Sequence, residues 1–327
     1  MTSSDMPEST RCVIIGGGAM GVGLLYFLAH EGWTDTVLVE KGELTSGSTW
    51  HAAGGFHTLN GDTNMAALQG YTIQLYKELE AITGMSCGLH HVGGITLADN
   101  TARFEMLKAE RAKHRYMGLH TEVLSPEEIV KMTDGLVNVD GVLGGLYDPL
   151  DGHLDPSGTT HAYAKAARMG GATIIQHNRV LETNPRSDGT WDVVTEQGTV
   201  HAEHVVNAGG IWAREVAAMA GVYLPLLPMA HQYLVTDDIP EIYNRGKEFP
   251  HVMDPGGESY LRQEGRGLCI GFYEQKCEPW STDGTPWEFG HELLNEEFDK
   301  IEDSVTFAYM RFPVLESAGV KRVIHGP

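Results

Sequence analysis

The sequence predicts an α/β protein in which a Rossmann-like nucleotide-binding domain is combined with a second, α+β domain built on an antiparallel sheet. Two observations support the first domain. An apolar run near the start leads into a glycine-rich turn and a helix, and the next apolar run ends in an acidic residue. The second domain rests on a change of pattern, because short strand-like segments dominate from residue 225 onward.

The nucleotide-binding pattern begins with the apolar run 11–15, which ends in the turn 16–21, Gly-Gly-Gly-Ala-Met-Gly. A helix is expected over 22–31 and a second strand over 36–39, followed directly by Glu40. A glycine-rich turn alone is a weak signal. Here strand, turn, helix, strand and acid follow one another in the order that dinucleotide binding requires.

Each residue of this pattern has a physical task. Gly16 permits the tight turn, Gly18 lets the backbone approach a pyrophosphate, and Gly21 lets helix and strand pack closely. The pyrophosphate is expected at the helix N-terminus, where free N–H groups and the helix dipole favour negative charge. Glu40 is expected to accept hydrogen bonds from ribose hydroxyls.

Two further segments are expected at the same ligand. The segment 41–55 is too polar for a buried strand and too rich in glycine for a stable helix, so we interpret it as a loop pressed against the ligand. The run 205–210 ends in glycines and precedes a helix from Trp212, which makes it a second strand-to-helix approach.

The other segments predict packing elements. Helices are expected over 65–84, over 102–116, beginning at 126, between 156 and the glycines at 170–171, and over 299–311. Strands are expected over 94–97, 172–176, 203–207, 230–235, 259–262 and 268–272, and a further strand is expected to begin over 319–324. Both domains are then discontinuous. Residues 10–88 and 141–224 form the nucleotide-binding domain, and residues 89–140 and 225–318 form the substrate-binding domain.

Composition limits the partners. The 327 residues carry a formal net charge of −21, which argues against nucleic acid and anionic membrane surfaces as partners. Membrane insertion is not expected, because no segment is apolar over the length that a membrane helix needs. The four cysteines are scattered and the first ten residues are polar, so we expect a cytoplasmic protein.

No metal site is predicted. His201 and His204 lie three apart in an extended segment and point to opposite faces. The aspartates at 148, 151 and 155 lack the spacing of a calcium loop, and Asp155 followed by Pro156 is better read as a helix N-cap.

Five segments of the chain resemble the dimethylglycine and sarcosine dehydrogenase family, and the segment 186–192, Arg-Ser-Asp-Gly-Thr-Trp-Asp, leans toward its dimethylglycine branch. The five segments, in the family's order, are 42–54, 151–156, 186–192, 231–236 and 260–264. The resemblance covers nearly the whole chain. It implies the fold of amine and glycine oxidases and a covalently bound FAD, joined to His51 at its 8α carbon.

The resemblance implies an enzyme that oxidises a small N-methylated amino acid, dimethylglycine or sarcosine, by hydride transfer to FAD. His231 is implied as the group that handles the proton and Tyr260 as the group that orients the substrate; either residue is also compatible with an ordinary polar position in a sheet. Arg262 stays unassigned between a substrate carboxylate and a structural role. The residues expected to contact FAD are Gly16, Gly18, Gly21, Glu40, Lys41, Thr45, Ser48, Thr49, His51, Ala52, Val180, Gly209 and Trp212.

Family members continue beyond the equivalent of Pro327 into a segment that contacts the flavin, so we expect this chain to be an amino-terminal part. Tetrahydrofolate is expected to take part only through a further carboxy-terminal region. The electron acceptor is left open between electron-transfer flavoprotein and oxygen. Two other functions stay open: oxidation of another secondary or tertiary amino acid, and a catalytically silent regulatory role on the same fold.

Overall fold

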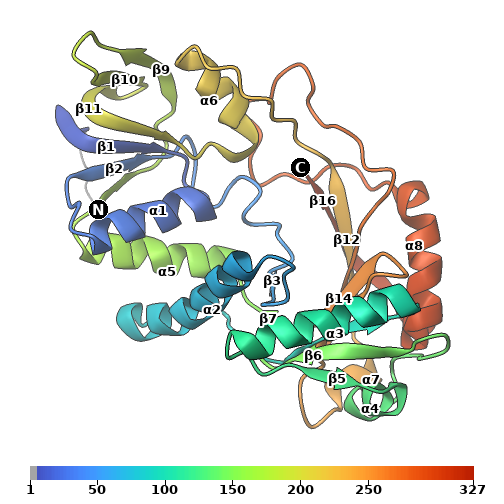
Figure 1. Ribbon diagram of the computed structural model, residues 1–327. Helices are drawn as coiled ribbons and strands as arrows, with labels where there is room; N and C mark the ends of the chain where they lie inside the picture. Colours follow the sequence, from blue (N-terminus) through green and yellow to red (C-terminus); the bar gives the residue numbers. More distant parts are fainter. Residues whose placement is uncertain (1–5) are drawn as a thin grey trace.

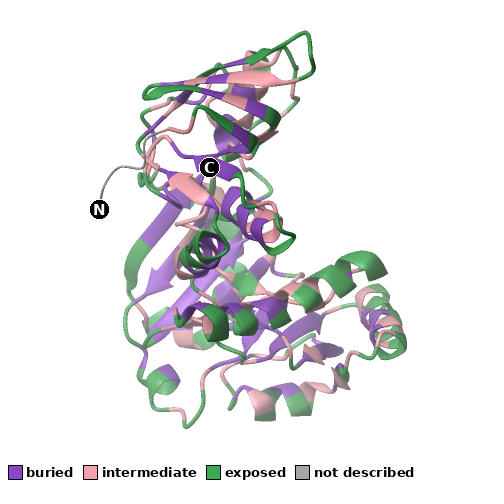
Figure 2. Ribbon diagram, turned by 90° about the vertical axis from the view of Figure 1, so that its left-hand side faces the viewer, coloured by how far each residue is buried: buried purple, intermediate pink, exposed green. Residues whose placement is uncertain are grey.

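The structure is a computed structural model that describes residues 6–327. It contains a six-stranded sheet, an eight-stranded sheet and a two-stranded ribbon. The six-stranded sheet lies at one end of the molecule and the eight-stranded sheet at the other, with helices packed beside both (Figure 1). Buried residues, purple in Figure 2, concentrate in the strands and on one side of most helices.

The six-stranded sheet carries the predicted nucleotide-binding pattern. Its centre is β1 (Ser9–Ile15), parallel to β2 (Thr36–Val39) on one side and to β11 (Gly198–Asn207) on the other. Helices α1 (Ala19–His30) and α5 (Pro156–Met169) pack against each other and cover one face. The order of the sheet is β8 (Thr173–Ile175), β2, β1, β11, β10 (Trp191–Thr195) and β9 (Val180–Pro185).

The eight-stranded sheet is the main element of the second domain, and its strands contribute to the largest cluster of buried apolar residues among residues 6–327. Its order is β16 (Val320–Gly326), β12 (His231–Thr236), β15 (Gly267–Phe272), β14 (Ser259–Glu264), β13 (His251–Asp254), β4 (Gly94–Ala98), β6 (Gly144–Asp148) and β5 (Glu122–Leu124). All neighbouring pairs are antiparallel except β13 and β4, which run parallel. The predicted antiparallel sheet is therefore mixed at one position.

The remaining elements are a two-stranded ribbon, six α-helices and two short 3-10 helices within residues 6–327. They are β3 (Gly55–Phe56) paired with β7 (Gly152–His153), the helices α2 (Thr63–Thr83), α3 (Thr101–Tyr116), α4 (Pro126–Met132), α6 (Ala213–Met219), α7 (Pro240–Tyr243) and α8 (Phe298–Arg311), and the short 3-10 helices Gly210–Trp212 and Pro313–Ser317. Asp155 caps α5 as predicted, since its carboxylate accepts from the backbone N–H of Ser157 at 2.9 Å. Among the helices of residues 6–327, none is both long enough and apolar enough to cross a membrane.

Sheet membership differs from the predicted domain boundaries at two places. β6 lies in the segment 141–224 that was expected in the nucleotide-binding domain, yet it pairs with β4 and β5 of the second sheet. β16 extends beyond the predicted limit at residue 318 and pairs with β12. Both are non-local pairings, which the local pattern of residues does not reveal.

Candidate active site

The glycine turn after β1 is built as the sequence predicts. A Cβ atom on Gly21 would lie 2.0 Å from the carbonyl oxygen of Gly16, so a side chain there has no room. The carboxylate of Glu40 accepts hydrogen bonds from the backbone N–H groups of Gly17 at 2.7 Å and Gly42 at 2.8 Å. Glu40 therefore holds the turn in shape in addition to any contact with a ligand.

A cleft opens above this turn, at the carboxyl ends of the parallel strands, and has a volume of about 220 Å³. We call it the nucleotide cleft. Among its lining residues are nine of the residues predicted to contact the cofactor: Gly16, Gly18, Glu40, Lys41, Ser48, Thr49, Val180, Gly209 and Trp212. Four predicted residues do not line it. Gly21 and Thr45 are buried behind it, Ala52 is exposed, and His51 faces a second cavity.

Lys41 helps to shape the cleft wall. Its ammonium group donates to the carbonyl oxygen of Phe289 at 2.8 Å and lies 4.2 Å from the ring centre of Trp212. Burial lowers the pKa of the Lys41 ammonium group. The sequence prediction missed two residues that lie almost 250 positions after Lys41 in the chain. Phe289 provides the carbonyl oxygen that Lys41 contacts, and Trp287 lines the cleft.

The loop that carries His51 is tied to the glycine turn by one backbone hydrogen bond and one side-chain hydrogen bond. Thr45 adopts a positive φ of 70° and its N–H donates to the carbonyl oxygen of Gly17 at 3.0 Å. The hydroxyl of Thr49 accepts from the N–H of Ala19 at 3.0 Å, at the start of α1. The position of His51 is therefore coupled to the turn where a pyrophosphate is expected.

His51 lines a second cavity, which we call the His51 cavity, with a volume of about 320 Å³. Its lining residues are Ser48, His51, Ala53, Met229, His231, Gln232, Tyr233, Tyr260, Phe272, Tyr273, Ile324, Gly326 and Pro327. Ser48 lines both cavities, so the two adjoin at this residue. The three residues that the sequence assigned to chemistry, His51, His231 and Tyr260, thus surround one space.

The imidazole of His51 is uncharged and unsatisfied in this arrangement. Burial lowers the pKa of His51 below its usual range. Its Nε2 atom is buried and has no hydrogen-bond partner among residues 6–327. The same atom lies 2.9 Å from where a Cβ on Gly326 would stand, so β16 packs directly against the ring. A neutral imidazole with a free nitrogen is a competent nucleophile.

His231 is oriented by a buried carboxylate that the sequence prediction missed. Its Nδ1 atom lies 3.2 Å from a carboxylate oxygen of Glu274, whose side chain is only 2% exposed. The hydrogen bond to Glu274 raises the pKa of the His231 imidazole, against the opposing effect of burial. Glu274 also accepts from the backbone N–H of Gln232 at 3.1 Å, which fixes the carboxylate. Only Nε2 of His231 is left for a substrate.

Tyr260 stands over a glycine on the neighbouring strand. A Cβ on Gly271 would lie 2.0 Å from the Tyr260 ring, and the register pairs Gly271 with both Tyr260 and Tyr233. Two tyrosine rings of the His51 cavity therefore flank a position without a side chain. Burial raises the pKa of the Tyr260 hydroxyl, which stays protonated and able to donate a hydrogen bond.

Arg262, left unassigned from the sequence, has a structural position. It is 7% exposed, its Nε donates to the carbonyl oxygen of Ala53 at 2.8 Å, and its guanidinium pairs with Glu264 at 2.6 Å. It anchors the loop after His51 to β14 and does not line the His51 cavity. Arg186 and Asp192, which belong to a family-like segment, pair with each other at 3.1 Å on the β9–β10 hairpin and line neither the nucleotide cleft nor the His51 cavity.

The residues present fit a dinucleotide cofactor with a flavin ring. The nucleotide cleft has the backbone geometry for a pyrophosphate, and His51, whose Nε2 atom is buried and unpartnered among residues 6–327, lines the adjoining cavity. A neutral imidazole at that place matches the nucleophile that a covalent flavin link requires.

Comparison with known proteins agrees with this geometry. The profile of the family described as FAD dependent oxidoreductase matches residues 11–325. Mitochondrial dimethylglycine dehydrogenase of Mus musculus is 42% identical over 325 residues, which are 98% of this chain and 37% of that protein. Mitochondrial sarcosine dehydrogenase of the same organism is 36% identical over 331 residues, 99% of this chain and 35% of that protein. The chain thus spans little more than a third of these relatives.

Among solved structures, L-proline dehydrogenase from P. horikoshii superposes with a TM-score of 0.84 at 24% identity, over 98% of this chain and 82% of that one. Glycine oxidase from Geobacillus kaustophilus superposes with a TM-score of 0.77 at 24% identity, with the same coverage of 98% and 82%. These likenesses confirm the predicted fold class.

Proposed function

Because the chain belongs to the FAD dependent oxidoreductase family, we propose that it is the flavin-binding part of an enzyme that oxidises a small N-methylated amino acid, dimethylglycine or sarcosine. The observation that carries the proposal is the His51 cavity. It brings the predicted attachment residue, His51, together with His231 and Tyr260, and it adjoins the nucleotide cleft at Ser48.

In this proposal the nucleotide cleft holds the nucleotide part of FAD and Nε2 of His51 carries the covalent link. Bound FAD supplies the acceptor for the hydride that leaves the substrate's N-methyl group. The chain's own residues bind and orient the substrate so that this carbon faces the flavin. The buried surroundings of His51 keep its imidazole neutral, which is the form that bonds to carbon.

His231 and Tyr260 act on the substrate. The amine nitrogen must be uncharged when the hydride leaves, so a base has to remove its proton first. Nε2 of neutral His231 accepts that proton, and Glu274 stabilises the resulting imidazolium through Nδ1. The protonated hydroxyl of Tyr260 donates a hydrogen bond that orients the substrate within the cavity.

A substrate panel tests the proposal. The flavin-loaded protein is mixed without oxygen with dimethylglycine, sarcosine, betaine, proline and glycine, and the loss of flavin absorbance is followed. We expect the fastest bleaching with dimethylglycine or sarcosine. Electron-transfer flavoprotein or oxygen is then added to the reduced protein to identify the acceptor. Bleaching by none of these amines would contradict an enzymatic role and favour a regulatory one.

The link between Glu274 and His231 predicts a pH effect. Because Glu274 raises the pKa of His231, the rate of flavin reduction should rise with pH through a value above 6.5, as the imidazole loses its proton. Glu274→Gln removes the charge that stabilises the imidazolium, so the rising limb should move to lower pH. The pH profile of single-turnover flavin reduction measures this shift. An unmoved limb in Glu274→Gln would remove His231 from the role of base.

A further inference from the structure

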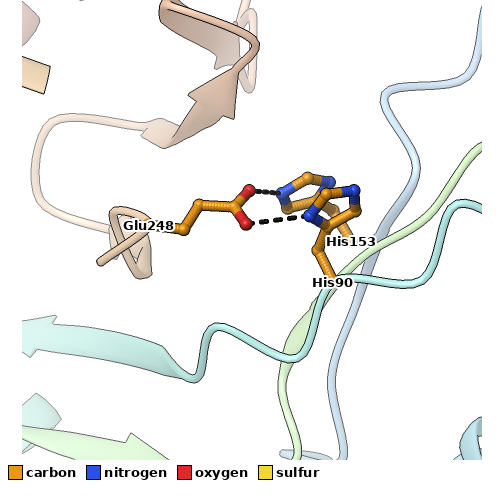
Figure 3. Close-up of side chains that lie close together, drawn as sticks. All are labelled: His90, His153 and Glu248. Atoms are coloured by element: carbon orange, nitrogen blue, oxygen red, sulfur yellow. Dashed lines mark hydrogen bonds and ion pairs between the residues drawn. The ribbon is translucent and has the colours of Figure 1, made fainter. Parts of the chain in front are cut away.

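Three side chains that are distant in the sequence, His90, His153 and Glu248, meet at one place in the structure (Figure 3). Nδ1 of His90 lies 2.8 Å from one carboxylate oxygen of Glu248, and Nε2 of His153 lies 2.8 Å from the other. His90 precedes β4, His153 ends β7, and Glu248 precedes β13. No spacing pattern in the sequence announces the group, because its members come from three separate segments.

The two imidazoles are held in place by the backbone. His90 and His153 form an antiparallel bridge in which each backbone N–H donates to the other residue's carbonyl oxygen, at 2.8 and 3.1 Å. Their rings stack with centroids 4.7 Å apart and an interplanar angle of 9°. The positions of the two nitrogens therefore follow from the bridge rather than from the contact with Glu248.

We propose that His90, His153 and Glu248 bind a divalent transition-metal ion, with Zn²⁺ as the favoured ion. Two imidazole nitrogens and one carboxylate are the protein ligands of many zinc sites that keep a fourth position open. The three ligand atoms lie within 4.8 Å of one another. Zinc bonds of about 2.1 Å in a tetrahedron separate ligand atoms by roughly 3.4 Å, so small side-chain rotations close the set around an ion.

The exposure of the three ligands and the charges around them determine how tightly the site should bind Zn²⁺. His153 is buried and Glu248 partly buried, whereas His90 is exposed and opens onto a cavity of about 690 Å³, which gives an ion a path and room for a fourth ligand. Of the four basic residues that line this cavity, Arg245 pairs with Asp134 at 3.0 Å and Arg262 pairs with Glu264. Lys247 and Arg322 also line the cavity and oppose a cation, so we expect affinity of about micromolar rather than tighter.

The test measures Zn²⁺ binding to the tag-free protein after treatment with a chelator and dialysis. Equilibrium dialysis against micromolar free Zn²⁺ should give one bound Zn²⁺ per chain, and Co²⁺ should give the visible absorption bands of a low-symmetry site. Glu248→Gln keeps the size and hydrogen-bonding capacity of the side chain but removes the charged ligand. It should weaken binding by roughly tenfold or more.

Matched controls separate this site from ordinary surface groups. Glu241→Gln replaces an exposed glutamate on the preceding helix α7, and His161→Ala replaces an exposed histidine on α5; both should bind Zn²⁺ as the unmodified protein does. His90→Ala should weaken binding as Glu248→Gln does. At a given Zn²⁺ concentration, the Tm of the unmodified protein and of both controls should rise by similar amounts, and the Tm of Glu248→Gln should rise less.

Two results would overturn the proposal. If the unmodified protein binds no Zn²⁺ in equilibrium dialysis against micromolar free Zn²⁺, the three residues form only a hydrogen-bonded bridge. If Glu248→Gln binds Zn²⁺ and gains Tm as the unmodified protein does, the ion is bound elsewhere. Neither result depends on flavin content or on oxidation of any amine, so the test stands apart from that of the proposed function.

Discussion

Replacing His51 with alanine should convert the attached flavin into one that acid releases. The imidazole is the only group of the His51 cavity that combines a neutral state with a buried, unpartnered nitrogen among residues 6–327, so the covalent bond has no substitute there. After acid precipitation the unmodified, flavin-loaded protein should keep its yellow colour in the pellet. His51→Ala should leave the colour in the supernatant.

His291 provides a matched control for this experiment. The rings of His51 and His291 pack edge-on against the same Trp50, with centroids 5.2 and 5.6 Å away. His291 is exposed and does not line the His51 cavity, so His291→Ala should keep the flavin in the pellet. Colour released from the unmodified protein, or retained by His51→Ala, would show that the flavin is not bound through this histidine.

Removing the groups that face the substrate should slow flavin reduction while leaving the flavin attached. His231→Ala removes the proposed base, and loss of such a group typically costs roughly 10²- to 10⁴-fold in rate. Tyr260→Phe removes one hydrogen bond and should cost about tenfold. Stopped-flow reduction by dimethylglycine, with flavin content measured on the same samples, distinguishes loss of chemistry from loss of cofactor.

Tyr309→Phe is the control for the tyrosine, since Tyr309 is an exposed residue of α8 outside the His51 cavity. It should reduce at the unmodified rate. Equal rates in His231→Ala, Tyr260→Phe and the unmodified protein would return both residues to ordinary positions in the sheet. Slow reduction in Tyr309→Phe would show that the effect is not specific to the cavity.

The parts of the fold that local sequence determines were predicted well. The strand, turn and helix around Gly16 are confirmed, and so is the cap at Asp155, because each depends on residues within a few positions of one another. β6 was missed for the opposite reason. Its sequence begins with two glycines, which favour no strand, and it becomes a strand only by pairing with β4 and β5.

In the candidate site, too, some residues could be predicted from the sequence and others could not. His51, His231 and Tyr260 were named from segments that resemble a family, and the fold brings them together in one cavity. Glu274 has no such signal, since its importance lies in a contact with a residue 43 positions away that only the packing of the sheet creates. Arg262 was ambiguous in the sequence because an arginine that pairs with a nearby glutamate, as Arg262 does with Glu264, cannot be told from a substrate-binding arginine by its residue type.

Gly271 has a consequence for how this cavity tolerates change. It stands in register between Tyr233 and Tyr260, and the space that its missing side chain leaves is filled by the Tyr260 ring. A methyl group there would collide with the ring and push it into the cavity. Under the proposed function, any side chain at position 271 would reduce the space available to a substrate, although Gly271 itself contributes no group that reacts.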